Sequence, residues 1–148
     1  MHRIFLKYFT VFAVGALVYG FLEVAGRGYT HISMGLLGGL SMVAIHISND
    51  ARREGLNYFI QIGIITLFIT SIEFITGEIL NVRLGMNIWD YSELPLNIDG
   101  QICLPFVVLW AVLSAIGIAF DDFLRWKMFR DDKDFDYLRR SVYKENAI

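Results

Sequence analysis

Four long stretches of this chain carry almost no charged residues, and they limit the possible folds more than any other feature. Charges gather instead at residues 2–7, 23–27, 50–54, 83–99 and 121–148. An apolar segment of about 18 or more residues can cross a bilayer as a helix, and a soluble chain of 148 residues could not bury several of them. Composition agrees, with 55% hydrophobic and 19% charged residues and a mean hydropathy of +0.50. We therefore predict an all-α, polytopic membrane protein.

We predict about four transmembrane helices in one domain. The expected spans are residues 4–22, 32–47, 58–80 and 102–120. Each must be helical, because a bilayer offers no partners for open backbone groups. A structured outer loop at 81–100 completes a domain covering 1–124, followed by a tail at 125–148. Apolar residues at helical spacing in the tail fit a short amphipathic helix, although partial disorder is an equal alternative.

The distribution of Lys and Arg predicts the orientation. Basic residues gather near the amino end, between the second and third spans, and in the tail. The other two loops carry one arginine each, Arg27 and Arg83. Short cytoplasmic loops are enriched in Lys and Arg. We therefore expect a multi-pass protein of the cell membrane with both termini in the cytoplasm and the 81–100 loop outside.

The expected outer loop, 81–100, is too apolar for a simple linker. Trp89 and Tyr91 lie beside the acid Asp90 in this segment. Because Trp and Tyr rings favour the headgroup zone of a bilayer, we expect a folded loop on or in the outer interface. Asp90 and Asn97 have two interpretations of about equal weight. They tie the loop together, or they bind a ligand beside the aromatic rings.

A polar stripe in the third span marks the strongest candidate site. One helix face there carries Thr66, Thr70, Glu73 and Gly77. An ionisable side chain inside a membrane is costly and by default indicates a function. We expect Glu73 to be protonated, or paired with a cation or a basic partner. Glu78 lies about 140° further around the helix, so an interfacial carboxylate paired with a nearby arginine is its simpler interpretation.

Small residues indicate where helices approach closely. They are Gly35 and Gly39 in the second span, Ala111, Ala115 and Ala119 in the fourth, and Ala16 and Gly20 in the first. Packing within one bundle is the favoured interpretation of each stripe. Three stripes in so small a bundle are, however, more easily explained by a homo-oligomer.

Other kinds of site lack their sequence signals. His31 and His46 have no companion ligand three or four residues away, and Cys103 is the single cysteine. We therefore expect no metal site and no cofactor. The chain has no phosphate-binding loop and no HExxH or GxSxG motif. A net charge of −2 without a basic face argues against nucleic acid as a partner.

A composite motif in the second half resembles a known family. It consists of Glu73, Thr76, Gly77, Trp89, Asp90, Tyr91, Ser92, Pro95, Asn97, Gly100, Pro105 and Trp110. Upstream, HISMGLLGGL at residues 31–40 adds a Ser-Met and Gly-Gly pattern. Over most of residues 15–120 the chain resembles the family named Putative ABC-transporter type IV, also called CmpB-like membrane proteins. The resemblance implies a transport- or permease-related component that works with a separate ATPase or another membrane subunit.

Three functions remain open at this point. In a transporter, Glu73 would bind a cation or proton, and the face carrying Thr66 and Thr70 would line the route. In an enzyme acting on a lipid or isoprenoid, Glu73, Glu78 and Asp90 would share acid–base chemistry. In an accessory subunit, the outer loop would dock a partner. A water-accessible path past Glu73 favours the first, a closed lipid pocket with converging carboxylates the second, and a solid core the third.

Overall fold

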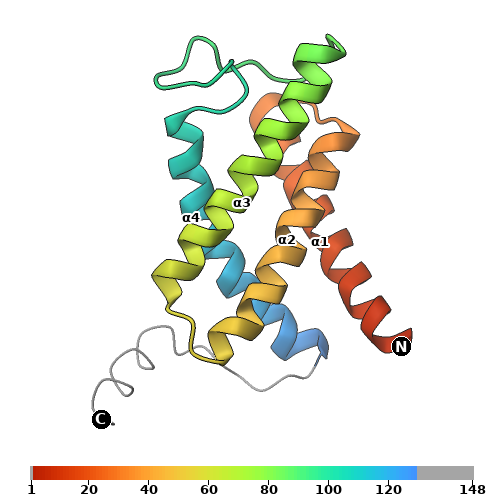
Figure 1. Ribbon diagram of the computed structural model, residues 1–148. Coiled ribbons are helices and arrows are strands. Elements are labelled where there is room, and N and C mark those ends of the chain that lie inside the picture. Colours follow the sequence, from red (N-terminus) through yellow and green to blue (C-terminus); the bar gives the residue numbers. More distant parts are fainter. Residues whose placement is uncertain (1, 130–148) are drawn as a thin grey trace, which may run out of the picture.

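The computed structural model describes residues 2–129 of the chain. Its long helices are α1 (His2–Arg27), α2 (Ile32–Arg53), α3 (Tyr58–Gly77) and α4 (Leu104–Leu124), arranged as an up-and-down bundle (Figure 1). Shorter π-helical segments continue two of them, η1 (Glu78–Arg83) after α3 and η2 (Arg125–Phe129) after α4. In this part of the chain every regular element is a helix, and four are long and apolar enough to cross a membrane. The prediction of an all-α, multi-pass membrane protein is confirmed.

The helices run past the limits set by hydropathy. The expected spans ended at residues 22, 47, 80 and 120, whereas the helical backbone continues to Arg27, Arg53, Arg83 and Phe129. Hydropathy marks the part of a helix that suits hydrocarbon, but the backbone stays helical until a cap or turn ends it. Residues 81–83 and 125–129, expected in the loop and the tail, are therefore helical. The two alternatives for the remaining tail, a short helix and partial disorder, concern residues outside the described part of the chain.

Local capping explains where three helices begin. The imidazole of His31 accepts a hydrogen bond from the Ser33 N–H at 3.2 Å at the start of α2. The Asn57 side chain accepts one from the Phe59 N–H at 2.9 Å at the start of α3. Pro105 occupies the first turn of α4, where its missing N–H costs nothing. His31 is thus a helix-capping residue.

The two ends of the bundle differ in structure. One end contains the start of α1, the turn at residues 54–57 and the end of η2, and we call it the terminal end (Figure 1). The other end contains the turn at residues 28–31 and the long segment 84–103, and we call it the loop end (Figure 1). The arrangement agrees with the expectation that the first and third loops share one side of the membrane.

α1 packs mainly on α2, and two glycines allow their close approach. A Cβ atom added at Gly15 would collide with the Gly38 carbonyl oxygen and with Met42. A Cβ atom added at Gly38 would collide with the Tyr19 side chain. Small residues at a helix crossing bring two backbones together in this way. The crossing therefore fixes Tyr19 of α1 against α2.

The small residues singled out in the sequence contribute unequally to packing. Gly39 faces the ring of Phe12, so it belongs to the contact between α1 and α2. A Cβ atom at Gly35 would lie 3.9 Å from the Ala16 carbonyl oxygen, and one at Gly20 would have no neighbour within 4 Å. On α4, Ala111 and Ala115 are half-buried while Ala119 is exposed. The close approach of the two helices is at Gly38. Gly38 lies about 100° around the helix from Gly39, so the sequence pair Gly35 and Gly39 marked a neighbouring face.

Two clusters of buried apolar side chains hold the bundle together. The larger contains Val11, Met42, Ile45, Ile65, Ile69, Trp110, Ile118 and Leu124. The smaller contains Met34, Leu37, Ile88 and Trp89 and lies at the loop end. Many other apolar side chains face outward, among them Leu17 with 74% and Phe21 with 72% of their surface exposed. An apolar exterior around an apolar core is what a bundle surrounded by lipid requires.

Candidate functional site

A pocket of about 450 Å³ opens between the four long helices. This volume lies within the usual range for small-molecule sites. Among the residues that line it, Glu73 is the one charged side chain. From Trp110 to Phe120 the pocket follows α4 for about 15 Å at 1.5 Å per residue. It is therefore a long apolar space with a carboxylate near the loop end.

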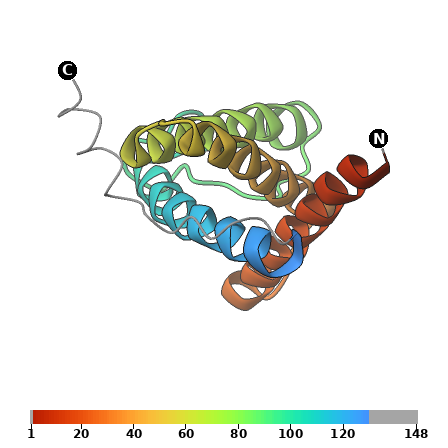
Figure 2. The same ribbon diagram turned by 90° about the horizontal axis from the view of Figure 1, so that it is seen from below.

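The pocket exists because α1 and α4 do not pack closely against each other. α1 packs on α2, whereas α4 packs on both α2 and α3. Figure 2 shows α1 leaning away from the other three helices at the terminal end. Gly15 and Gly38, which allow α1 to approach α2, and Gly117, which faces Ile45, are part of the pocket lining. The gap between α1 and α4 thus borders a cavity whose floor is formed by α2 and α3.

Glu73 is almost fully buried, with 2% of its surface exposed. The Trp110 indole N–H donates a hydrogen bond to one carboxylate oxygen at 2.6 Å, and the Tyr91 hydroxyl donates to the other at 3.1 Å. No basic side chain among residues 4–129 forms an ion pair with Glu73. Both oxygens are satisfied by neutral donors, so the charge itself stays without a counter-charge.

Aromatic rings surround this carboxylate. The ring centroids of Tyr19 and Trp110 lie 5.8 Å apart, and both rings line the pocket. Behind them, Tyr91 stacks on Phe106 with 4.4 Å between centroids. Burial raises the pKa of the Tyr91 hydroxyl above its ordinary value, and the nearby Glu73 carboxylate raises it further. Tyr91 therefore remains a neutral hydrogen-bond donor at physiological pH.

The segment 84–103 is fixed to the end of α3 by side-chain amides. Asn81 donates to the Trp89 carbonyl oxygen at 3.0 Å and to the Gln101 side chain at 2.9 Å, and it accepts from the Ile88 N–H at 2.7 Å. The Trp89 indole N–H donates to the Gln101 carbonyl oxygen at 3.0 Å. Gly77 leaves room for both Trp89 and Gln101. Through these contacts, the loop holds Tyr91 in place over Glu73.

Asp90 and Asn97 bond the backbone of the same loop. Asp90 accepts from the Ser92 N–H at 2.9 Å, which holds the pKa of this carboxyl below its ordinary value. Asn97 donates to the carbonyl oxygens of Ser92 and Leu94 at 3.0 and 2.9 Å, and accepts from the Gly100 N–H at 3.2 Å. Asp90 and Asn97 were expected either to tie the loop together or to bind a ligand. These hydrogen bonds support the first interpretation.

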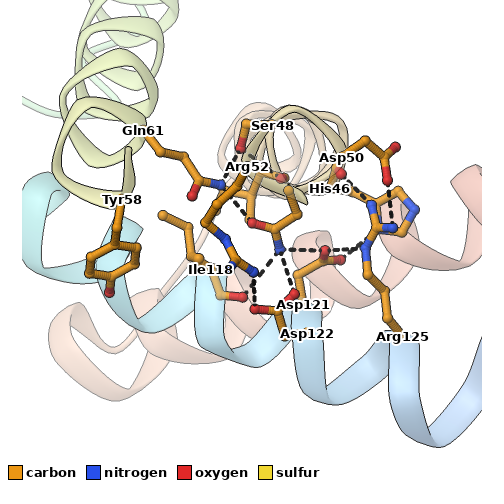
Figure 3. A network of polar contacts seen from close by, with 12 residues as sticks. His46, Ser48, Asp50, Arg52, Tyr58, Gln61, Ile118, Asp121, Asp122 and Arg125 are labelled. Carbon is orange, nitrogen blue, oxygen red and sulfur yellow. Dashed lines mark hydrogen bonds and ion pairs between the residues drawn. The ribbon is translucent and has the colours of Figure 1, made fainter. Parts of the chain in front are cut away.

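A second polar cluster is buried at the terminal end, and we call it the terminal network (Figure 3). Its members are His46, Ser48, Asn49, Asp50, Arg52, Gln61, Asp121, Asp122 and Arg125. They come from α2, α3, α4 and η2. The network therefore joins three of the four long helices at one end of the bundle.

Asp121 is at the centre of the terminal network (Figure 3). One of its oxygens shares a hydrogen bond with the His46 imidazole at 2.7 Å. The other accepts from Asn49 at 2.8 Å and from the Arg125 guanidinium at 2.9 Å. Arg125 also pairs with Asp50 at 2.7 Å. Every one of these side chains except Asp50 is buried, so the charges depend on each other for compensation.

The outer members extend the network toward α3. Arg52 and Asp122 form a buried ion pair. Asn49 accepts a hydrogen bond from Gln61 of α3 at 2.6 Å. The pocket ends beside this network, because its lining includes Ile45, the neighbour of His46, and Phe120, the neighbour of Asp121. An apolar space thus separates the Glu73 site from the terminal network.

Comparison with known proteins gives one family. The model of the family described as Putative ABC-transporter type IV matches residues 3–130. The chain belongs to this family. No curated protein and no solved structure matches it significantly. Family membership and the four apolar helices together describe a transport-related, multi-pass membrane protein.

In this member of the ABC-transporter type IV family, the predicted site residues divide into two groups. Glu73 and Tyr91 meet at the pocket. Trp89 lies beneath the loop with 5% of its surface exposed, so its ring is in the core and not in the headgroup zone. Its indole N–H is satisfied by the loop backbone, which explains why burial is tolerated. Trp89 therefore supports the site without lining it.

The other polar residues of the predicted α3 stripe lie outside the pocket lining. The Thr66 hydroxyl donates to the Ile62 carbonyl oxygen of its own helix at 2.8 Å. Thr70 is half-buried, and its hydroxyl has no hydrogen-bond partner among the described residues. Glu78 is half-buried, and the ion pair of Arg27 is made with Glu23 at 2.5 Å. Arg27 is thus paired with an acid of its own helix, four residues earlier, and not with Glu78.

Sequence reasoning missed the neighbours of Glu73 and the terminal network. Trp110 was visible as part of the family motif, but nothing in its surroundings indicated that it donates to Glu73. Tyr19 gave no signal, because its position depends on the crossing of α1 and α2. The terminal network was missed since charges at the ends of apolar spans resemble ordinary interfacial charges. Within residues 2–129, no three His, Cys, Asp or Glu side chains are grouped as metal ligands.

Proposed function

We propose that this protein transports a substrate through the pocket and that Glu73 is the residue that binds a cation or a proton. The observation that carries the proposal is a buried carboxylate, without a basic partner among residues 4–129, in the wall of an apolar pocket. A charge in such surroundings is costly, and ionisable groups at this depth typically belong to ion or proton pathways. Family membership supports transport over the alternatives.

The two ends of the pocket supply the gates in this proposal. The loop end is covered by the segment 84–103, whose Tyr91 bonds Glu73 directly. The terminal end is closed by ion pairs of the terminal network, such as Arg52 with Asp122. Ion pairs at packed interfaces exchange partners in known switching transitions. We propose that these contacts open alternately.

Family membership supports a proposal for the energy source and a partner. We propose that a separate ATPase subunit binds at the terminal end, where the turn at 54–57 joins α2 to α3. The Lys and Arg distribution supports a cytoplasmic location for this end. A homo-oligomer in the cell membrane remains part of the proposal, because four helices enclose little volume.

The alternatives have less support from the same geometry. An enzyme acting on a lipid would need two carboxylates in one pocket, but Glu78 and Asp90 are absent from the lining. An accessory subunit would need no cavity, yet a pocket of about 450 Å³ lies within this bundle. Transport is therefore the function that the Glu73 pocket supports best.

Cysteine labelling tests this proposal without knowledge of the substrate. Ser41 lines the pocket, and its hydroxyl bonds only its own helix at 2.7 Å, so Ser41→Cys is a mild change. Cys103 is first replaced by serine, a favourable residue at this N-cap position of α4. The reagent is a membrane-impermeant, trimethylammonium-bearing methanethiosulfonate, applied to native vesicles of either orientation. We expect reaction at Ser41→Cys from at least one aqueous side.

Ser71→Cys is the matched control for this experiment. Ser71 makes the same bond to its own helix, to the Leu67 carbonyl oxygen at 2.7 Å, but it is exposed on the outside of α3. It should therefore face lipid and not react. Met86→Cys, in the exposed part of the loop, shows that the reagent was delivered. If Met86→Cys reacts while Ser41→Cys is as inert as Ser71→Cys on both sides, no aqueous route reaches the pocket and the proposal fails.

A further inference from the structure

The charge in the pocket restricts what it can hold. Glu73 is the sole charged side chain in the lining. The remaining polar groups are few, since the Ser41 hydroxyl bonds its own helix and the Trp110 N–H is used by Glu73. An anionic ligand would meet a carboxylate with no basic group to compensate it. A cation, in contrast, would supply the counter-charge that Glu73 lacks.

The surroundings of Glu73 fit an organic cation better than a metal ion. Hard metal ions require several oxygen ligands, but Glu73 is the one carboxylate in the lining, and the Tyr19 hydroxyl lies close to Glu23 as well. The rings of Tyr19 and Trp110 stand beside the carboxylate with centroids 5.8 Å apart. Aromatic faces attract quaternary and other organic cations, especially where water is excluded. A carboxylate with two rings is therefore suited to a bulky organic cation.

The rest of the pocket fits an apolar body attached to that cation. Beyond Glu73 the lining is aliphatic and aromatic, with residues such as Leu37, Ile69, Leu113 and Phe120. Such a surface gains free energy by covering apolar groups, at roughly 25 cal/mol per Å². A small hydrophilic cation would leave most of the volume empty or wet. The ligand must therefore combine a positive centre with a large apolar part.

We infer that the ligand of this pocket is an apolar organic cation, whose charged centre lies between Glu73 and the rings of Tyr19 and Trp110. The inference names the substrate class within the proposed function and in that sense rests on it. We propose that such a molecule enters between α1 and α4, since these helices do not pack closely on each other. A proton that binds Glu73 competes with this cation.

A pair of probes with equal shape and opposite charge tests the inference. Tetraphenylphosphonium and tetraphenylborate differ little except in the sign of their charge. Binding of each to the full-length protein in lipid nanodiscs is measured by equilibrium dialysis, with empty nanodiscs subtracted. We expect saturable binding of the phosphonium and at least tenfold weaker binding of the borate. Acidification should weaken phosphonium binding, because protons compete for Glu73.

Substitutions locate the effect at the site. Glu73→Gln should remove the preference for the cation. Tyr19→Leu should weaken phosphonium binding roughly three- to tenfold, as expected for the loss of one cation–π contact. Tyr19→Phe keeps the ring and should bind like the wild type, and it remains informative if Tyr19→Leu does not fold. Ser71→Ala, on the lipid-facing side of α3, is the matched control and should change nothing.

Three results would overturn the inference. They are equal affinity for the two probes, an unchanged preference in Glu73→Gln, and no saturable binding of the phosphonium. Binding is measured at equilibrium and needs no transport, whereas labelling at Ser41→Cys needs no organic cation. Labelling without phosphonium binding would reject this ligand class and leave transport standing. Phosphonium binding without labelling would retain the ligand class and reject the transport route.

Discussion

At the residue scale, the donors to Glu73 come from parts of the chain that are far apart in sequence. Tyr91 belongs to the segment 84–103 and Trp110 to the second turn of α4. Both are neutral, so they orient the carboxylate without cancelling its charge. A purely structural polar residue at this position would be served as well by glutamine, which has no charge to desolvate. The observed arrangement therefore favours a residue whose charge is used.

Sequence reasoning could identify Glu73 but not its partners. A carboxylate in an apolar span is conspicuous by itself, because an ionisable side chain at that depth is costly whatever its neighbours in sequence. Trp110 lies 37 residues further along the chain, and only the packing of α4 on α3 brings its N–H to the carboxylate. Tyr19 similarly requires the crossing of α1 and α2 at Gly38.

Asp90 gives a prediction on pH. Its pKa is held below the ordinary value by the hydrogen bond from Ser92, so its contribution to loop stability is complete above the unfolded pKa of about 3.9. That contribution is lost as the pH falls through the lower folded value. We expect protection of the 84–103 amides against hydrogen exchange, corrected for intrinsic rates, to decrease below about pH 4.

The Asp90→Ala variant is the control for this measurement. It should show the lower protection already at neutral pH, and it should lack this acid-dependent decrease. Because Asp90 is exposed, the effect should be small and confined to the loop. Equal pH profiles for the wild type and Asp90→Ala would mean that another group controls the acid response.

At the element scale, the segment 84–103 behaves as a folded cover attached to α3. Its order comes from Asn81, Trp89 and Gln101, which bond one another's side chains and backbone. Turn-forming and aromatic residues allowed the sequence to predict a structured loop. They could not predict that Trp89 points inward, because the headgroup zone and the bundle core are equally suitable for an indole whose N–H is satisfied.

Truncation of Trp89 should loosen this cover. Trp89→Ala removes a buried ring and should destabilise the protein by about 3–5 kcal/mol, with the largest loss of hydrogen-exchange protection in residues 84–103. Leu96→Ala is the matched control, since Leu96 lies in the same loop with 74% of its surface exposed. It should leave protection unchanged. Similar protection in Trp89→Ala and Leu96→Ala would show that the ring does not hold the loop.

At the scale of the whole molecule, the bundle places one polar region at the loop end and another at the terminal end. Between them lies the apolar pocket. The terminal network joins α2, α3 and α4 through buried charges such as Arg52 and Asp122. α1 packs mainly on α2, and its Tyr8 ring lies against the His46 ring of the network with 5.6 Å between centroids.

Breaking the terminal network should affect the stability of the whole protein. Arg52→Leu or Asp122→Leu leaves a buried charge without its main partner and should cost about 3–5 kcal/mol of unfolding free energy. The double variant removes both charges and should recover most of this loss. Unfolding in mixed micelles by denaturing detergent provides the measurement. A double variant as unstable as the sum of the single ones would show that the two residues do not act as a pair.

The same variants distinguish a gate from a scaffold. If the network gates the pocket, the double variant should be folded and yet react faster at Ser41→Cys from the terminal side. An unchanged labelling rate, together with restored stability, would assign the network to structure alone.

The sequence by itself determined the class of protein, the four spans, the pairing of their ends and the carboxylate in α3. These properties follow from local composition, because the bilayer selects for apolar length and penalises an internal charge wherever it occurs. Only the tertiary structure decided which side chains meet Glu73, which glycines form the helix crossing and which terminal charges are buried. Those properties depend on how each helix is rotated and how far apart the helices lie. Many weak packing contacts between residues distant in sequence determine both.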